Sequence, residues 1–227
     1  MTAGCSRCSG KWRPDLTPPL APRHLRRMRL KLTCALVGGL AVLAAPAVTA
    51  QRAVQLTAGA TSSGTIVNDG VLLTKLRPAI APTVGVAIAI PTGGGPYRVR
   101  LEADVASSAL NATTGGTTYR LSTLTTITAL VMAEGPLLGD VRWQLGGGAI
   151  FYRPSENQGV FLDGPTRRWL VAAGAVYSRQ LTPALSLIVN GRIDAHSFVT
   201  DVLRARNYAG SQGVERYTLQ LGIQRKL

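Results

Sequence analysis

The chain has 227 residues, a formal net charge of +14 and three cysteines, all of which precede residue 35. Half of that net charge also belongs to the first 50 residues. The sequence therefore excludes disulfide and thiol chemistry from residues 51–227. Its high isoelectric point does not by itself indicate a nucleic-acid partner, and we expect none.

An export signal is expected at residues 28–50. Two basic residues precede an apolar run over 32–45, and small side chains lead up to Ala50 and Gln51. This order is typical of a cleaved signal peptide, and the run is shorter than the roughly 20 residues of a membrane-spanning helix. We therefore predict cleavage between Ala50 and Gln51.

The residues before this signal, 1–27, are rich in arginine and proline and show no apolar periodicity. Because a signal peptide works from the N-terminus, we interpret 1–27 as a disordered stretch upstream of the true start at Met28. The expected organisation is thus an upstream stretch over 1–27, a signal peptide over 28–50 and one mature domain over 51–227.

The mature domain consists of segments in which apolar and polar residues alternate. In the clearest, 97–108, apolar residues occupy the odd positions from Tyr97 to Val105, and four charged residues occupy the even positions between them. A period of two indicates a strand with two different faces. Four successive charges are incompatible with the core of a soluble protein, whereas a wet lumen on one side and lipid on the other accommodate both faces.

Eight segments share this pattern, and turn-forming residues such as glycine, proline and asparagine separate them. The segments cover about 52–60, 75–90, 97–108, 117–132, 141–154, 167–181, 184–201 and 214–227. An even number of strands places both chain ends on one side, and closing the sheet removes its open edges. We predict an all-β fold, an eight-stranded antiparallel up-and-down transmembrane β-barrel over 51–227.

The aromatic residues provide an independent test of this arrangement. If the odd-numbered segments run outward from the periplasm, the aromatic side chains collect at two levels and share the lipid-facing parity of their segments. The periplasmic level would hold Tyr97, Trp143 and Tyr177, and the outer level Tyr119, Phe151, Trp169 and Tyr217. Two aromatic girdles are typical of a membrane barrel, whereas a soluble barrel places such residues inside.

The chain resembles the small eight-stranded outer-membrane barrels of Gram-negative bacteria, the OmpA/OmpX/OmpW-type family. The resemblance lies in the export site at Ala50 and Gln51, the eight segments, the girdles and the terminal strand 217–227. It implies residence in the bacterial outer membrane, insertion by the barrel-assembly machinery, contact with outer-membrane lipid and lipopolysaccharide, and a monomer. Family members usually end in an aromatic residue that this machinery reads, and here the last residue is Leu227. The family's functions are diverse, so the resemblance assigns none.

Charged residues gather at the positions that would face the lumen. The expected lumen network consists of Arg98, Arg100, Glu102, Asp104, Arg120, Arg142, Arg192, Asp194, His196 and Arg216. The third and seventh strands lie opposite each other in an eight-stranded ring, so Glu102 and Asp104 can pair with Arg192 across the interior. We therefore expect a lumen closed by ion pairs. A charged lumen speaks against a hydrophobic ligand, and eight strands leave no room for a wide channel.

Five arginines would lie at the extracellular end of the barrel. They are Arg153, Arg167, Arg168, Arg204 and Arg206. Guanidinium groups bind phosphate through paired hydrogen bonds, so this rim is a candidate contact for anionic lipopolysaccharide or another anionic surface ligand. The alternative is that these are ordinary rim charges that hold the barrel at its depth.

The mature domain offers few groups for catalysis. Its one histidine, His196, precedes Ser197, and adjacent residues of a strand point to opposite faces. The two side chains are therefore not expected to form the histidine–serine pair of a lipid A deacylase. One histidine and no cysteine also make a transition-metal site unexpected. We expect no catalytic residue, no cofactor and no metal.

Together these features predict a non-enzymatic outer-membrane barrel with a structural or surface-interaction role, through adhesion or through contact with lipopolysaccharide. Two alternatives stay open. One is a small-solute or hydrophobic-compound channel, and the other is a lipid-modifying enzyme such as a lipid A deacylase.

Overall fold

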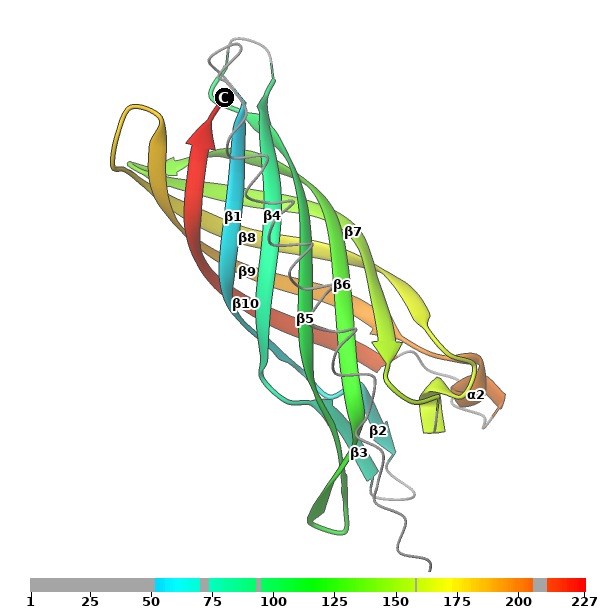
Figure 1. The fold of residues 1–227 in the computed structure, drawn as a ribbon. Helices are drawn as coiled ribbons and strands as arrows, with labels where there is room; N and C mark the ends of the chain where they lie inside the picture. The colour runs from blue at the N-terminus through cyan, green and yellow to red at the C-terminus, as the bar shows by residue number, and fades with distance from the viewer. Residues whose placement is uncertain (1–51, 70–73, 93–94, 158, 206–211) are drawn as a thin grey trace, which may run out of the picture. The chain divides into compact units, whose positions relative to one another are not determined.

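A computed structural model describes residues 52–69, 74–92, 95–157, 159–205 and 212–227. Within them, long antiparallel strands form one sheet that closes on itself (Figure 1). The ring consists of β1 (Ala53–Ser63), β4 (Ala81–Pro91), β5 (Arg98–Thr114), β6 (Thr117–Leu138), β7 (Val141–Pro154), β8 (Thr166–Gln180), β9 (Leu185–Phe198) and β10 (Gln212–Lys226). Short elements lie at one end: β2 (Val67–Asp69), β3 (Thr74–Pro78), the 3-10 helix η1 (Gly159–Phe161) and the helix α2 (Asp201–Ala205).

Closure depends on the first strand, which pairs on both sides. Leu56 of β1 lies opposite Val86 of β4 and opposite Ile223 of β10. The remaining neighbours in the ring follow chain order, and every pair is antiparallel. The predicted eight-stranded up-and-down barrel is therefore confirmed. The expected signal peptide and its cleavage site fall in residues 1–51, outside the described residues.

One predicted strand, 75–90, is divided into β3 and β4. Both pieces pair with β5, but one extra residue between Pro78 and Thr83 shifts the register. Ile80, in this interruption, is exposed, while the Ala79 amide still donates to the Ala109 carbonyl. Such a bulge adds one residue and reverses which positions face inward. The same strand thus continues beyond the barrel with the opposite parity.

The connections distinguish the two ends of the barrel. At the end of the barrel where β1 begins and β10 ends, β4–β5, β6–β7 and β8–β9 are joined within 92–97, 139–140 and 181–184. The β7–β8 and β9–β10 connections at the other end are longer and contain η1 and α2. Membrane barrels have short periplasmic turns and long extracellular loops, so the end where β1 begins and β10 ends is the periplasmic side.

The outer face of the barrel wall is apolar and the inner face is largely polar, which is the reverse of a soluble protein. Large apolar side chains point outward and are exposed, among them Trp169 (72 %), Val171 (64 %) and Leu219 (62 %). Alternate residues point inward and are buried, and many of these are polar or charged. No helix within the described segments is long and apolar enough to cross a membrane. An apolar outer band around a polar interior is the arrangement of a transmembrane β-barrel.

The wall is closely packed where strands carry glycine. At Gly148 of β7, an added Cβ atom would clash with the Ala129 carbonyl oxygen of β6. A glycine at this position therefore lets the neighbouring backbone approach, as in other tightly curved sheets.

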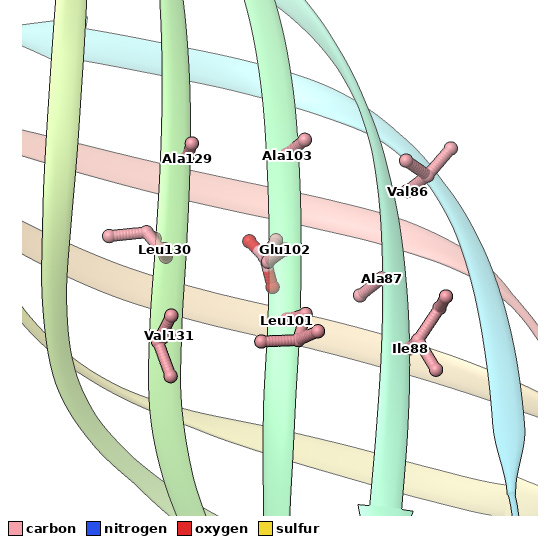
Figure 2. Close-up of a pocket in the computed structure, with 9 residues that line it drawn as sticks. All are labelled: Val86, Ala87, Ile88, Leu101, Glu102, Ala103, Ala129, Leu130 and Val131. Atoms are coloured by element: carbon pink, nitrogen blue, oxygen red, sulfur yellow. The ribbon is translucent and has the colours of Figure 1, made fainter.

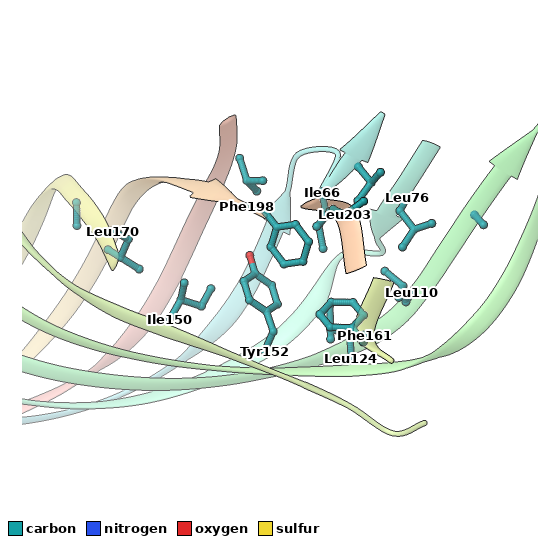
Figure 3. Close-up of a cluster of buried hydrophobic side chains, with 14 of the residues drawn as sticks. Ile66, Leu76, Leu110, Leu124, Ile150, Tyr152, Phe161, Leu170, Phe198 and Leu203 are labelled. Carbon is teal, nitrogen blue, oxygen red and sulfur yellow. The ribbon is translucent and has the colours of Figure 1, made fainter. Parts of the chain in front are cut away.

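The interior has two layers. Ion pairs fill the middle and the periplasmic half. An apolar cluster occupies the extracellular half, where Figure 3 shows Tyr152, Phe161 and Phe198 among leucine and isoleucine side chains. Phe161 belongs to η1 and Leu203 to α2, so the two extracellular segments contribute to the cluster from above the wall.

Candidate functional site

The centre of the lumen is organised around Arg192 of β9, which is 3 % exposed. Its Nε donates to Asp194 at 2.7 Å, its Nη2 donates to Asp104 of β5 at 2.8 Å, and its Nη1 pairs with Glu102. The opposite strands of the ring therefore meet across the interior, as expected from the strand count. One guanidinium is matched by three buried carboxylates.

Further groups satisfy these carboxylates. Arg100 donates to Glu102 at 2.5 Å, Gln220 donates to Asp104 at 3.0 Å, and Arg216 lies 3.7 Å from Asp194. All of these side chains are buried. Buried charges are tolerated when opposite charges and hydrogen bonds surround them, so this layer is a packed plug of the barrel.

A second group of charges lies at the periplasmic mouth. Glu134 of β6 is buried and accepts a hydrogen bond from Arg142 at 2.6 Å. Arg98 is 3.8 Å and Arg100 4.0 Å from the same carboxylate. Arg98 and Arg142 are partly exposed, which places them where the lumen opens. Glu134 was missed as a partner because the expected strand, 117–132, ended two residues too early.

Arg120 does not belong to this network, and the expectation that it faces the lumen is wrong. The β5–β6 ladder skips Leu121, so that Ser122 pairs with Leu110 while Arg120 pairs with Asn111. Such a bulge turns the residues on its far side, 117–120, to the other face. Arg120 is exposed on the extracellular hairpin.

His196 lies inside the barrel between the two layers. Its Nε2 shares a hydrogen bond of 2.6 Å with the hydroxyl of Tyr152 on β7. Ser197 is exposed on the outer face of β9, so the wall separates it from the imidazole of His196. This geometry offers no serine for the histidine to activate.

The extracellular half of the lumen is apolar, whereas the sequence predicted a charged lumen. Leu124, Ile150, Leu170 and Phe198 take the inward positions there and are buried with the cap residue Phe161. Their inward orientation could be predicted from the sequence, because these residues share the parity of the charged residues nearer the periplasm. The contributions of Phe161 in η1 and Leu203 in α2 could be recognised only in the three-dimensional structure.

The aromatic residues of the wall point outward at two levels. Tyr97 and Trp143 pack against each other at the periplasmic end, with ring centroids 6.4 Å apart, and Tyr177 lies opposite Val141 nearby. At the other end, Phe151, Trp169 and Tyr217 are exposed.

Tyr119 does not share the lipid-facing parity assigned to it. The bulge at Leu121 pairs Tyr119 with Ala112, an inward position of β5. Its side chain is nevertheless 56 % exposed, because the hairpin continues beyond the barrel at this height.

The five rim arginines occupy different environments. Arg153 and Arg167 are exposed on the outward face of β7 and β8, and the Arg167 guanidinium lies 5.4 Å from the Trp169 ring centroid. Arg168 has inward parity and is partly buried. Arg204 pairs with Asp201 of α2 at 2.7 Å. Arg206 lies outside the described residues.

The outer wall also carries a shallow apolar hollow of about 370 Å³ over β4, β5 and β6. Figure 2 shows its floor at Ala103 and Ala129, between the larger side chains of Val86, Leu101 and Val131. These side chains face the lipid side, so the hollow offers apolar contact but no catalytic group. Among the described residues, no cluster of histidine, cysteine, aspartate and glutamate could hold a metal ion.

The apolar outer wall, the two levels of aromatic residues and the polar interior identify the chain as an outer-membrane-type β-barrel. No family model matches the chain, and no curated protein matches it. Similar solved structures include Neisserial surface protein A, with a TM-score of 0.46 and 15 % identity over 78 % of this chain and 97 % of that chain. A major outer membrane protein from Thermus thermophilus has a TM-score of 0.46 and 16 % identity over 79 % and 100 % of the two chains.

The attachment invasion locus protein Ail of Yersinia pestis has a TM-score of 0.41 and 11 % identity over 79 % of this chain and 100 % of that chain. These likenesses are distant, and the fold described above follows from this chain's own strand pairing.

Proposed function

We propose that this outer-membrane barrel is non-enzymatic and has a structural and surface-interaction role, in which its outer boundary contacts the phosphate groups of lipopolysaccharide. The observation that supports this role is the outward placement of Arg153 and Arg167 on neighbouring strands. Both residues are exposed on the outward face of the wall.

The register brings these two arginines close together. Arg167 lies opposite Phe151 on β7, and Arg153 follows Phe151 by two residues on the same face. Below them, Phe151 and Trp169 point toward the acyl region, and the contact between Arg167 and the Trp169 ring favours an outward-facing guanidinium. Two adjacent guanidinium groups above aromatic residues suit a phosphate at the membrane surface.

The content of the lumen favours a surface role over a transport role. The ion pairs around Arg192 fill the middle of the barrel, and the apolar cluster fills the extracellular half. A hydrophobic-compound channel is the second candidate, because the apolar cluster would suit such a ligand if the cap residues Phe161 and Leu203 moved. The buried charges below it disfavour onward passage.

Thermal unfolding in detergent tests the lipopolysaccharide contact. We compare the parent, Arg153→Ala/Arg167→Ala and the control Arg52→Ala/Arg179→Ala, which loses the same charge at the periplasmic end, where both residues are exposed. Each is measured alone, with purified lipopolysaccharide and with its dephosphorylated form. We expect intact lipopolysaccharide to stabilise the parent and the control but not the rim variant. Equal stabilisation of all three proteins, or equal stabilisation by the dephosphorylated form, would refute the contact.

A further inference from the structure

The periplasmic mouth of the lumen carries more positive charge than its own ion pairs match. At the centre of the barrel, three arginines face three carboxylates: Arg100, Arg192 and Arg216 with Glu102, Asp104 and Asp194. At the mouth, Arg98 and Arg142 share the carboxylate of Glu134, at 3.8 Å and 2.6 Å. Among these described lumen residues, the centre is therefore balanced, whereas the mouth has two cations for one anion.

The charges around the mouth do not remove this surplus. Asp140, in the turn before β7, is exposed, and so are the basic residues Arg52, Arg179 and Lys226 at the same end. Water and salt screen exposed charges over about 8 Å, whereas charges inside a protein are screened much less. Arg98 and Arg142 are only partly exposed, so their surplus charge is available to an anion that enters the mouth.

Buried polar groups beside Glu134 lack partners within the described chain. Gln144 of β7 lies opposite Glu134 in the register and is 2 % exposed, yet neither its Nε2 nor its Oε1 has a hydrogen-bond partner there. The Oε2 atom of Glu134 and the Nη2 atom of Arg100 are also buried and unpartnered. An unpartnered buried group is destabilising, so such groups normally meet water or a ligand. Two of these atoms are donors and two are acceptors.

The strand register gathers these groups on one side of the lumen. Arg98, Glu134 and Gln144 lie in one row across β5, β6 and β7. Arg142 precedes Gln144 by two residues and projects from the same face of β7, nearer the periplasm. Its guanidinium donates to Glu134 and to the Pro96 carbonyl oxygen. The unpartnered atoms thus lie beside two partly exposed guanidinium groups, at the barrel end where β10 finishes (Figure 1).

The geometry points to this mouth as a binding site for the C-terminal carboxylate of a periplasmic peptide. One carboxylate matches the surplus of one positive charge, and its two oxygens accept hydrogen bonds from the guanidinium groups of Arg98 and Arg142. The backbone N–H of the same terminal residue donates to an unpartnered oxygen of Glu134 or Gln144. The amide nitrogen of Gln144 donates to the peptide's oxygen atoms.

Other anions satisfy only part of this site. A simple carboxylate or sulfate has acceptors only, and would leave the buried oxygens of Glu134 and Gln144 without a donor. A phosphate monoester carries about 1.5–2 negative charges at neutral pH, more than the surplus. A free amino acid adds an ammonium group and brings no net charge. The last residue of a peptide combines one carboxylate with a neutral N–H, which is a known mode of terminal recognition.

The test uses the peptide acetyl-Ala-Ala-Ala, titrated calorimetrically into the full barrel in a nonionic detergent, whose head group does not compete for arginine. Three matched compounds each lack one feature: the same peptide with a C-terminal amide lacks the charge, acetate lacks the N–H, and free alanine lacks the net charge. We expect saturable one-to-one binding of the peptide acid, at least tenfold weaker binding of the other three, and an affinity that falls as salt is added.

Gln144→Leu is the decisive variant. It removes a side chain without hydrogen-bond partners in the described chain, so urea unfolding of the peptide-free barrel should show no loss of stability. Its affinity for the peptide should fall about tenfold or more, as expected for lost hydrogen bonds to a charged group. Arg98→Gln leaves Glu134 paired with Arg142 and should weaken binding to a similar degree. Arg179→Ala removes an exposed charge at the same end and should bind as the parent does.

This site lies at the opposite end of the barrel from the proposed lipopolysaccharide contact and does not depend on it. The Arg153→Ala/Arg167→Ala variant should therefore bind the peptide normally. The site is refuted if the peptide acid does not bind, if the amide or acetate binds equally, or if Gln144→Leu leaves the affinity unchanged. Absence of binding together with a more stable Gln144→Leu barrel would mean that the buried amide meets water alone.

Discussion

Replacing Arg192 with methionine should destabilise the barrel more than any other single charge removal in the lumen. The substitution keeps a long unbranched side chain but leaves three buried carboxylates without their shared cation. Glu102 retains Arg100 at 2.5 Å, and Asp194 retains Arg216 at 3.7 Å. Among the described residues, the hydrogen-bond partner that Asp104 retains is the Gln220 side-chain amide at 3.0 Å. The cost therefore concentrates at Asp104.

Breaking a buried ion pair by removing one partner costs about 3–5 kcal/mol, because a charge stays buried without compensation. We expect Arg192→Met to lower the free energy of unfolding by about this amount. Adding Asp104→Asn to the same protein removes the orphaned charge and should recover about 0.5–3 kcal/mol, the usual coupling between residues in one network.

Urea unfolding of the folded barrel in detergent, followed by tryptophan fluorescence and by the mobility shift on heating, measures these changes. The control is Arg204→Met, which removes an ion pair to Asp201 in which both side chains are largely exposed. Exposed pairs contribute about 0–1 kcal/mol, so this variant should resemble the parent. If Arg192→Met loses no more stability than the Arg204 control, or if Asp104→Asn adds to the loss, the plug does not work as described.

Three further predictions concern the lumen, the His196 contact and export. In planar bilayers the purified barrel should show no stable large conductance, because side chains fill its interior, and steady open-channel steps would contradict this. Tyr152→Phe should lower the free energy of unfolding by about 1–3 kcal/mol, because it leaves His196 without its hydrogen-bond partner. Urea unfolding compares it with Tyr177→Phe on the exposed outer wall. An equal loss in both variants would exclude a role for the hydrogen bond. N-terminal sequencing of the protein from an outer-membrane fraction should begin at Gln51, and a mature protein that retains residues upstream of Ala50 would disprove the cleavage site.

The alternation of apolar and charged residues was sufficient to predict the barrel. In β5, four charges at even positions required a polar interior, and the structure places Arg100, Glu102 and Asp104 there. The pairing of these residues with Arg192 followed from counting strands around a ring. The period of a strand depends on local residue order, and the number of strands follows from counting segments, so both can be read from the sequence.

What escaped prediction depends on register and on loops. The bulge at Leu121 reverses the parity of Arg120 and Tyr119, and no residue type marks it, because most residues tolerate a bulge. Phe161 and Leu203 lie in connections whose path over the mouth depends on tertiary packing. A period-two pattern predicts which face a residue occupies only as far as the next bulge. Wrong assignments of facing therefore occur at the extracellular ends, beyond the bulge at Leu121.

The charge plug also has a consequence for the order in which the barrel can assemble. Asp104 and Glu102 belong to the third strand of the ring, whereas Arg192 enters with the seventh, about ninety residues later. Until β9 arrives, these carboxylates lack their principal cation, and an open sheet carrying them in lipid is unfavourable. The last two strands thus supply both the seam with β1 and the counter-charge of the interior. Insertion of the strands and pairing of the buried charges therefore occur in one cooperative step. A partly inserted chain, with Glu102 and Asp104 not yet paired to Arg192, is unstable in the membrane.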